Sequence, residues 1–210
     1  MRIITIASQK GGSGKTTLAG HLAVAADQDG SGPVAIIDTD PQGSLASWWN
    51  TREAPTPHFA AVDVAQLTEQ LATLDRQGMK LVIIDTPPEI LAIIQAATVV
   101  ADFVVIPARP SPHDLRAVAT VVEMAEEANK PFCFVVNGAT PRSTIAREAI
   151  TALAAHGKVA PVTIHHRVDF AASMTDGRTV GEVTPDSRSA QEITALCRYV
   201  LTQVRKYVKN

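Results

Sequence analysis

Short apolar runs rich in β-branched residues alternate along the chain with longer segments whose apolar residues recur every three or four positions. The short runs predict buried strands and the longer segments predict helices. Strands are expected at 3–7, 34–38, 81–84, 103–106, 132–136 and 161–164, helices at 16–26, 44–50, 65–74, 90–100, 114–128, 143–156, 167–175 and 190–208, and a loop at 51–58. This alternation predicts an α/β fold, a doubly wound, mostly parallel sheet with helices on both faces.

The composition is that of a globular chain, with 46% apolar and 19% charged residues. A length of 210 residues predicts a single domain over 1–210. Cys133 and Cys197 stand inside apolar patterns, which favours reduced core thiols and a cytoplasmic protein. The sequence contains no run of eighteen apolar residues. A signal peptide is not expected either, because the sequence starts with an expected strand. The net charge of −2 means that any nucleic-acid binding must come from a local patch.

A glycine-rich segment joins the first expected strand to the first expected helix, and it reads Lys10-Gly11-Gly12-Ser13-Gly14-Lys15-Thr16-Thr17. This position is typical of a phosphate-binding loop, because glycines let backbone amides turn inward and a helix N-terminus attracts anions. We expect Lys15 to reach the β- and γ-phosphates and Thr16 to ligate Mg²⁺. The common motif G-x-x-x-x-G-K-[ST] fails at its first position, which is Gln9, and a second lysine precedes the glycine pair.

Aspartates end two of the expected strands, and ligands of open α/β sheets bind at the carboxyl ends of strands. The strand at 81–84 runs into Asp85, which is the Walker B pattern and predicts a carboxylate that holds Mg²⁺ through a water. The strand at 34–38 ends in Asp38, and Asp40 follows in the sequence D-T-D-P-Q-G. For Asp40, the alternative to a role in the site is an Asx-turn cap on the next helix.

The glycine-rich segment resembles the deviant Walker A motif K-G-G-x-G-K-[ST] of the ParA/MinD family of ATPases, and residues 38–43 resemble the switch I motif of ParA proteins. The resemblance implies ATP and Mg²⁺ as cofactors, with Asp40 beside Thr16 and Asp85 at the metal. It further implies that Lys10 crosses a dimer interface to the partner's nucleotide, that Asp40 orients the attacking water, and that Asp38 supports the lysine and metal network. Hydrolysis is then expected to be slow in the monomer.

Two later segments also resemble small, plasmid-type ParA proteins. Pro107–Pro112, followed by Asp114, matches the segment P-x-x-P-S-P-x-D near the dimer face of those proteins. Asn137 stands where the family places a polar side chain against adenine, and a turn residue before Gly138 is the alternative interpretation.

The C-terminal segments 165–170 and 177–180 resemble a family block in which a small-residue helix precedes a glycine and an extended strand. The pair His165-His166 has no metal-like companions in the sequence, so we interpret it as surface or packing. We interpret Trp48-Trp49 as a packing pair rather than a base-stacking platform.

The resemblance implies a partition or positioning ATPase. An ATP-bound homodimer would bind DNA non-specifically through its phosphates, and a centromere-binding or cargo adaptor protein would stimulate hydrolysis and release it. Operator-specific binding is not expected, because the phosphate loop begins almost at residue 1. The expected location is the bacterial cytoplasm, on the nucleoid. Candidate DNA contacts are Arg142, Arg147, Arg167, Arg188, Arg198, Arg205, Lys206 and Lys209.

A MinD-like membrane ATPase that places the division site is the main alternative. It requires an amphipathic C-terminal helix, and an apolar stripe of that kind is formed by Leu196, Val200, Val204 and Val208. The stripe is mostly valine, so core packing explains it better and membrane binding is not expected. Relatives that transfer electrons or pump anions need cluster cysteines or a second ATPase domain, and the sequence has neither. A nucleotide switch without hydrolysis would leave Asp40 unused.

Overall fold

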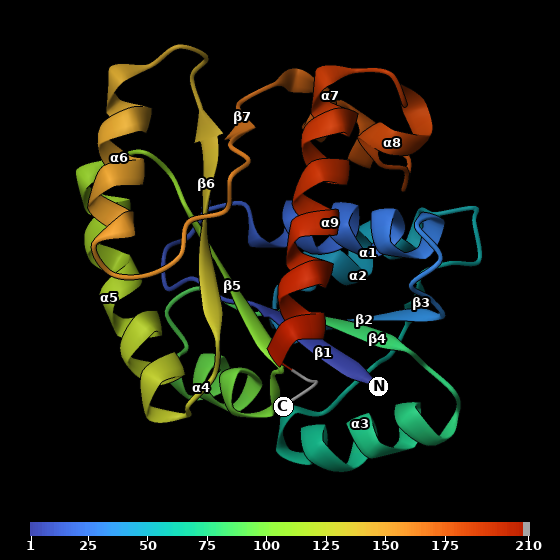
Figure 1. The fold of residues 1–210 in the computed structure, drawn as a ribbon. Coiled ribbons are helices and arrows are strands. Elements are labelled where there is room, and N and C mark those ends of the chain that lie inside the picture. The colour runs from blue at the N-terminus through green and yellow to red at the C-terminus, as the bar shows by residue number, and fades with distance from the viewer. Residues whose placement is uncertain (208–210) are drawn as a thin grey trace.

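In the computed structural model, which describes residues 1–207, a seven-stranded sheet carries helices on both faces (Figure 1). The strand order is β3-β2-β4-β1-β5-β6-β7, and every neighbouring pair is parallel. The expected doubly wound α/β fold is therefore confirmed. The strands are β1 (Arg2–Ile6), β2 (Val34–Asp38), β3 (His58–Phe59), β4 (Leu81–Asp85), β5 (Phe103–Ala108), β6 (Phe132–Ala139) and β7 (Ile164–His165).

Helices follow most of the strands, as a parallel sheet requires. They are α1 (Lys15–Gln28), α2 (Ser44–Asn50), α3 (Leu67–Arg76), which a 3₁₀ turn at Val64–Gln66 precedes, α4 (Leu91–Val100), α5 (Pro112–Glu127), α6 (Thr144–Ala154), α7 (Val168–Met174), α8 (Val180–Val183) and α9 (Arg188–Tyr207). Successive strand residues point to opposite faces, so the sheet separates two apolar layers. Ile4 and Ile6 pack with α1, α2 and α7–α9, whereas Val104 and Ile106 pack with α4–α6.

The structure corrects four expectations about element boundaries. The last strand pairs only through Ile164–His165, and the loop expected at 51–58 ends in the short strand β3. The strand expected at 103–106 continues through Pro107–Ala108 as part of β5, so it includes the start of the proline-containing segment 107–112. The extended strand that the family resemblance implied after Gly177 is instead helix α8, because Thr179 and Glu182 form a capping box that starts a helix.

Helix α9 crosses the sheet beside α1 and buries the apolar stripe on which the membrane alternative depended (Figure 1). Leu196, Val200 and Val204 are each at most 1% exposed. This part of the stripe therefore belongs to the core, as expected, while Val208 lies outside the described residues. Both cysteines are free and buried, and burial raises the pKa of each thiol to about 12, which agrees with unreactive core thiols.

His21 connects the first helix to the C-terminal part of the chain. Its Nδ1–H donates to the Thr17 carbonyl at 2.8 Å, and its Nε2 accepts the backbone N–H of Val180 at 3.2 Å. The ring is 1% exposed, and burial lowers its pKa to about 4. His21 is therefore a neutral ring at physiological pH, and it joins the helix that begins at the phosphate loop to α8.

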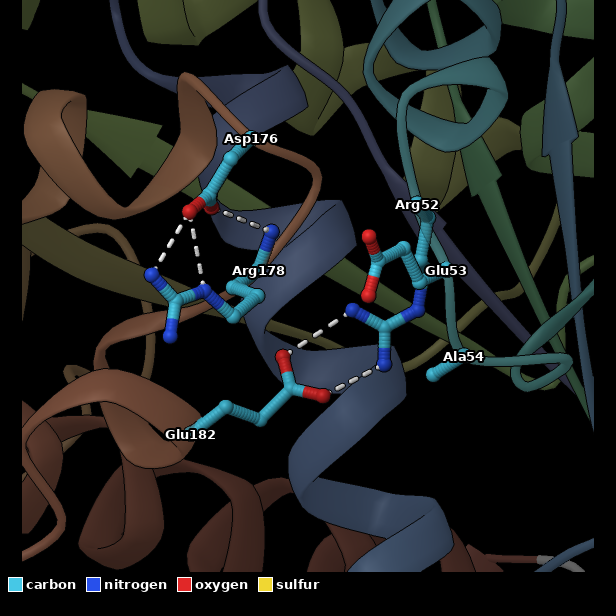
Figure 2. Close-up of a pocket in the computed structure, with 6 residues that line it drawn as sticks. All are labelled: Arg52, Glu53, Ala54, Asp176, Arg178 and Glu182. Atoms are coloured by element: carbon cyan, nitrogen blue, oxygen red, sulfur yellow. Dashed lines mark hydrogen bonds and ion pairs between the residues drawn. The ribbon is translucent and has the colours of Figure 1, made fainter.

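A partly buried ion pair connects the end of α2 to α8 in the same way. The guanidinium of Arg52 forms two hydrogen bonds with the Glu182 carboxylate, at 2.6 and 3.0 Å, and the two side chains point toward one another in Figure 2. Arg52 also donates to the carbonyls of Thr56 and Gly177, each at 2.6 Å, and lies over the ring of Trp48. The nearby cavity of about 430 Å³ holds mainly charged side chains that already pair with each other, among them Asp176 with Arg178.

Gly177 makes this junction possible, which gives a stability prediction. Its φ is 78°, and a Cβ there would lie 2.4 Å from the Cα of Arg52. Gly30 has nearly the same φ, 77°, but open space around it. We expect Gly177→Ala to lower the free energy of unfolding by roughly 2 kcal/mol or more beyond the loss in Gly30→Ala, because only the first adds a steric clash to the backbone strain. Urea denaturation of both variants measures the difference, and equal losses would contradict the packing described.

Candidate nucleotide-binding site

The carboxyl ends of β1, β2 and β4 form the floor of the site. The turn that leaves β1 is the glycine-rich segment, with φ values of 72° at Gly12 and 91° at Gly14, both in the region that favours glycine. Gly14 is also constrained by its surroundings, because a Cβ there would lie 2.1 Å from the Asn137 side-chain amide. The turn passes directly into α1, a helix of 14 residues, so the N-terminus of this helix lies at the turn. Backbone amides and the positive end of the helix thus meet at one place.

Three of the predicted residues meet at this turn. The Oγ1 of Thr16 donates to Oδ2 of Asp85 at 2.6 Å, and the ammonium of Lys15 donates to the Lys10 carbonyl at 3.2 Å. Lys15 is only 6% exposed, and burial lowers its pKa while the carboxylates of Asp85 and Asp40 oppose that shift. The lysine, the hydroxyl and the Walker B carboxylate therefore lie together, as the motif predicted.

Asp85 is fully enclosed at the end of β4. Burial raises its pKa to about 7 against the hydrogen bond from Thr16, and the neighbouring carboxylate of Asp38 adds to the increase. Asp85 Oδ1 and the hydroxyl of Ser13 are buried without a hydrogen-bond partner among residues 1–207. A buried oxygen without a partner is costly. A hydrated Mg²⁺ at Asp85 would supply the missing partner, so this donor set fits the predicted metal.

Asp38 and Asp40 hold the loop that follows β2. Asp38 pairs in register with Asp85 across β2 and β4, and its two oxygens accept the backbone N–H groups of Asp40 at 3.0 Å and Ala46 at 2.9 Å. Asp40 Oδ1 accepts the N–H of Gln42 at 2.9 Å, which is the Asx turn considered above. The cap on α2 comes from Asp38 rather than Asp40, so the second carboxylate oxygen of Asp40 faces no donor in this turn.

A cavity of about 370 Å³ opens over the loop. It is lined by Lys15, Thr16 and Asp40 together with residues that had not been singled out from the sequence, namely Ser44, Pro88 and Arg109. The side chain of Lys10 is exposed and does not line it. This position is compatible with the expected reach of Lys10 across an interface, a role that remains a prediction.

A second cavity, of about 210 Å³, adjoins the first and shares Gly14, Thr17 and Arg109 with it. Asn137 lines it and donates to the Ser13 carbonyl at 2.6 Å. Asn137 lies inside β6, so the turn interpretation is wrong, because β6 continues through a bulge to Ala139. The proposed contact with adenine stays a prediction.

The sequence also marked the pairs His165-His166 and Trp48-Trp49; the first lines the second cavity with His166 exposed, and the second is structural. His165 and Arg167 both bind the carboxylate of Glu192, with contacts of 2.7–2.8 Å, so His165 has a packing role. Trp48 is 5% exposed, and its indole N–H donates to the Arg178 carbonyl. The indole N–H of Trp49 donates to the Pro57 carbonyl at 2.8 Å, so both rings are part of the packing, as expected.

Sequence reasoning missed Arg109, Ser44 and Pro88 as lining residues of the first cavity. Arg109 was visible inside the segment P-A-R-P-S-P at the end of a predicted strand. Ser44 and Pro88 each follow a motif that sequence analysis identified, by one and three residues. Their positions at the carboxyl edge of the sheet were therefore the available signal.

The candidate DNA contacts lie at two edges of the sheet rather than at one. Arg142 and Arg147 are exposed near the start of α6, after the carboxyl end of β6. Arg205 lines a cavity with Met1 and Lys80, at the opposite edge where β1 and β4 begin. Arg188 and Lys206 are exposed on α9, Arg198 lies 3.7 Å from Asp29, Arg167 is engaged by Glu192, and Lys209 lies outside the described residues.

Proteins with a phosphate-binding loop at the first strand and an acid at the end of a neighbouring strand form the class of phosphate-loop nucleotide-binding proteins. The present fold and site define the chain as a member of that class. A model of the CobQ/CobB/MinD/ParA nucleotide-binding domain matches residues 4–180, and the chain belongs to this family. The expected resemblance to the ParA and MinD ATPases is confirmed.

The sequence relatives include proteins named for positioning and partitioning, and a solved MinD structure shares the fold. The chain is 30% identical to the Maintenance of carboxysome distribution protein A of Halothiobacillus neapolitanus, covering 90% of this chain and 91% of that protein. It is 27% identical to the Chromosome-partitioning ATPase Soj of Thermus thermophilus, covering 98% of each. The septum site-determining protein MinD of Pyrococcus horikoshii, solved with Mg-ADP, superposes with a TM-score of 0.80 at 18% identity, over 100% of this chain and 98% of that one.

No helix within residues 1–207 is both long and apolar enough to cross a membrane.

The buried carboxyl group of Asp85 gives a pH-dependent prediction for protein free of metal and nucleotide. Its pKa rises from 3.8 to about 7 on folding, so the folded state binds the proton more tightly and its stability falls as pH rises from about 4 to 7. Asp85→Asn removes this penalty. We expect the variant to be more stable than the original protein by roughly 1–3 kcal/mol at pH 8.

At pH 4.5 the two proteins should differ little, because the carboxyl group is then largely protonated when folded. Urea unfolding in EDTA at both pH values measures this. A variant that is equally destabilised at both pH values would show that Asp85 is not held with a raised pKa.

Proposed function

We propose that this protein is an ATP-dependent positioning ATPase that alternates between an ATP-bound homodimer and an ADP-bound monomer. The main support is the convergence of Lys15, Thr16 and Asp40 on one cavity beside the glycine-rich loop, with the buried Asp85 hydrogen-bonded to Thr16. Family membership supports nucleotide binding, and the names of the relatives support positioning. The cargo belongs to one of the two kinds those names describe, a region of DNA or a protein body.

The residues would divide the reaction as follows. Amides of residues 11–14 and the ammonium of Lys15 bind the phosphates, while Thr16 and Asp85 hold Mg²⁺, which neutralises charge on the phosphate oxygens. Asp40 orients a water whose oxygen attacks the γ-phosphorus as the bond to the bridging oxygen breaks, giving ADP and phosphate. Asp38 acts by holding the loop and the first turn of α2, so it is a positioning residue.

Lys10 completes the site from the other subunit in this proposal. Its side chain is exposed and outside the cavity of its own subunit, so it is free to reach a partner's nucleotide. A cation supplied in this way stabilises the charge of the transition state. Hydrolysis then depends on dimerisation, and a partner protein that favours the closed dimer raises the rate.

This role predicts a separation of binding from turnover. We expect Lys10→Ala to bind ATP within about threefold of the original protein, and to lose at least about tenfold in turnover, since a trans-acting cation contributes mainly to the transition state. ITC with ATP and a phosphate-release assay measure the two quantities. Lys80→Ala, an exposed lysine at the opposite edge of the sheet, is the control and should keep both. Unchanged turnover in Lys10→Ala would remove Lys10 from the reaction.

The matrix on which the dimer acts is proposed to be DNA, which it binds through phosphates. The apolar stripe of α9 is buried in the core as far as Val204, which leaves few apolar side chains to insert into a membrane. Arginines on α6 and α9, by contrast, are exposed. In this proposal the protein acts in the bacterial cytoplasm and on the nucleoid. The membrane-bound alternative is favoured by the structural likeness to MinD alone.

Co-sedimentation separates the two. Using Asp40→Ala to hold the ATP state, we expect binding to non-specific duplex DNA with ATP but not ADP, and a decrease of about tenfold or more in affinity between 50 and 200 mM salt. Anionic vesicles should not sediment the protein in either nucleotide. Binding to vesicles without binding to DNA would instead favour the membrane-associated ATPase.

A further inference from the structure

Arg109 stands at the junction of the two cavities of the nucleotide site. It follows the last residue of β5, so the carboxyl edge of the sheet carries it to the same side as the glycine-rich loop. Only three residues line both the 370 Å³ and the 210 Å³ cavity, and they are Gly14, Thr17 and Arg109. The first two belong to the loop and its helix, whereas Arg109 reaches the junction from the opposite wall.

Two glycines fix where the side chain lies. A Cβ at Gly138 would be 3.7 Å from Cγ of Arg109, and a Cβ at Gly12 would be 3.9 Å from its Nη2. The aliphatic part of Arg109 therefore runs past the bulge of β6, and the guanidinium ends over the glycine-rich loop. Gly138 has a φ of 68° at that bulge, so the backbone that makes room for the arginine is itself specialised.

The charge of Arg109 is not compensated by the protein. Within residues 1–207 its guanidinium forms neither a hydrogen bond nor an ion pair, and the residue is exposed. It lines the same cavity as the ammonium of Lys15 and faces the loop whose amides also carry positive partial charge. Asp40 supplies the one carboxylate among the described residues that line this cavity, so Lys15 and Arg109 together leave an excess of positive charge that a bound anion would neutralise.

We propose that Arg109 binds the phosphate chain of the nucleotide held by its own subunit, as a second cation opposite Lys15. This inference rests on the proposed nucleotide-binding function and adds a ligand from the β5–α5 connection. A guanidinium presents parallel N–H donors that match two phosphate oxygens, whereas Lys15 acts as a point charge from the loop side. The two cations then hold the phosphate chain from two walls, while the adjoining cavity receives the remainder of the nucleotide.

The test measures binding of ADP by ITC, since ADP carries the phosphate chain and the proposed dimer requires ATP. We expect Arg109→Gln to lower the affinity for ADP and for ATP by about tenfold to a hundredfold, which is the effect of losing one charge-assisted hydrogen-bonded contact. Arg109→Lys should fall between, because it keeps the charge and loses the paired donors. Arg116→Gln, an exposed arginine on α5 that lines neither cavity, should bind as the original protein does.

Thermal unfolding without nucleotide should be unchanged in Arg109→Gln, because the guanidinium has no partner to lose among the described residues. Two outcomes overturn the proposal: ADP affinity within twofold of the original protein, or a loss of ATP turnover with unchanged ADP affinity, which would assign Arg109 to the partner's site.

The proposed function itself is tested separately with Lys15→Ala. If the original protein binds ADP and Lys15→Ala does not, an unchanged Arg109→Gln refutes only the role of Arg109. If the original protein binds neither ADP nor ATP, both proposals fail.

Discussion

The carboxyl group of Asp85 is enclosed at the end of a central strand with only one of its two oxygens hydrogen-bonded within the described chain. Such a group is costly to bury, and the cost appears as the increase of its pKa to about 7. The surrounding structure keeps it there: β4 lies between β1 and β2, and the side chain of Thr39 donates to the Asp85 carbonyl at 2.7 Å. An apolar residue would cost less free energy to bury at this position. The carboxyl group that stands there instead keeps one oxygen available for a ligand.

The C-terminal part of the chain lines the second cavity through residues of 164–171 and also supports the site from behind. His21 joins α8 to the helix that starts at the phosphate loop, and the Arg52–Glu182 pair joins α8 to the helix that follows Asp40. The first contact is buried and the second is partly buried, and removing one partner of either would leave a polar group without compensation. Helix α8 therefore holds both nucleotide-facing elements of this side of the sheet in one arrangement.

Charge at the site is divided between two walls. The acids Asp38 and Asp85 come from adjacent strands, and the cations approach from the loop and from the end of β5. Lys15 is buried and partly balanced by carboxylates, whereas Arg109 is exposed and unbalanced within the described residues. An anion with several oxygens that also carries a divalent cation would satisfy both walls at once, which is the physical argument for the proposed Mg²⁺-bound nucleotide.

The sequence alone determined the fold class, because short apolar runs and period-3.6 apolar patterns are local and strong, and its motifs predicted the loop, Thr16 and Asp85, which the structure brings together. The sequence did not determine the strand order, which brings Asp38 into register with Asp85. The same order joins the side chain of Thr39 to the Asp85 carbonyl, 46 residues further along the chain. Short strands such as β3 and β7 were misjudged because two residues carry no periodicity. Only the tertiary structure placed Arg109 over Gly12, because the local sequence P-A-R-P-S-P does not predict which loop the arginine side chain contacts.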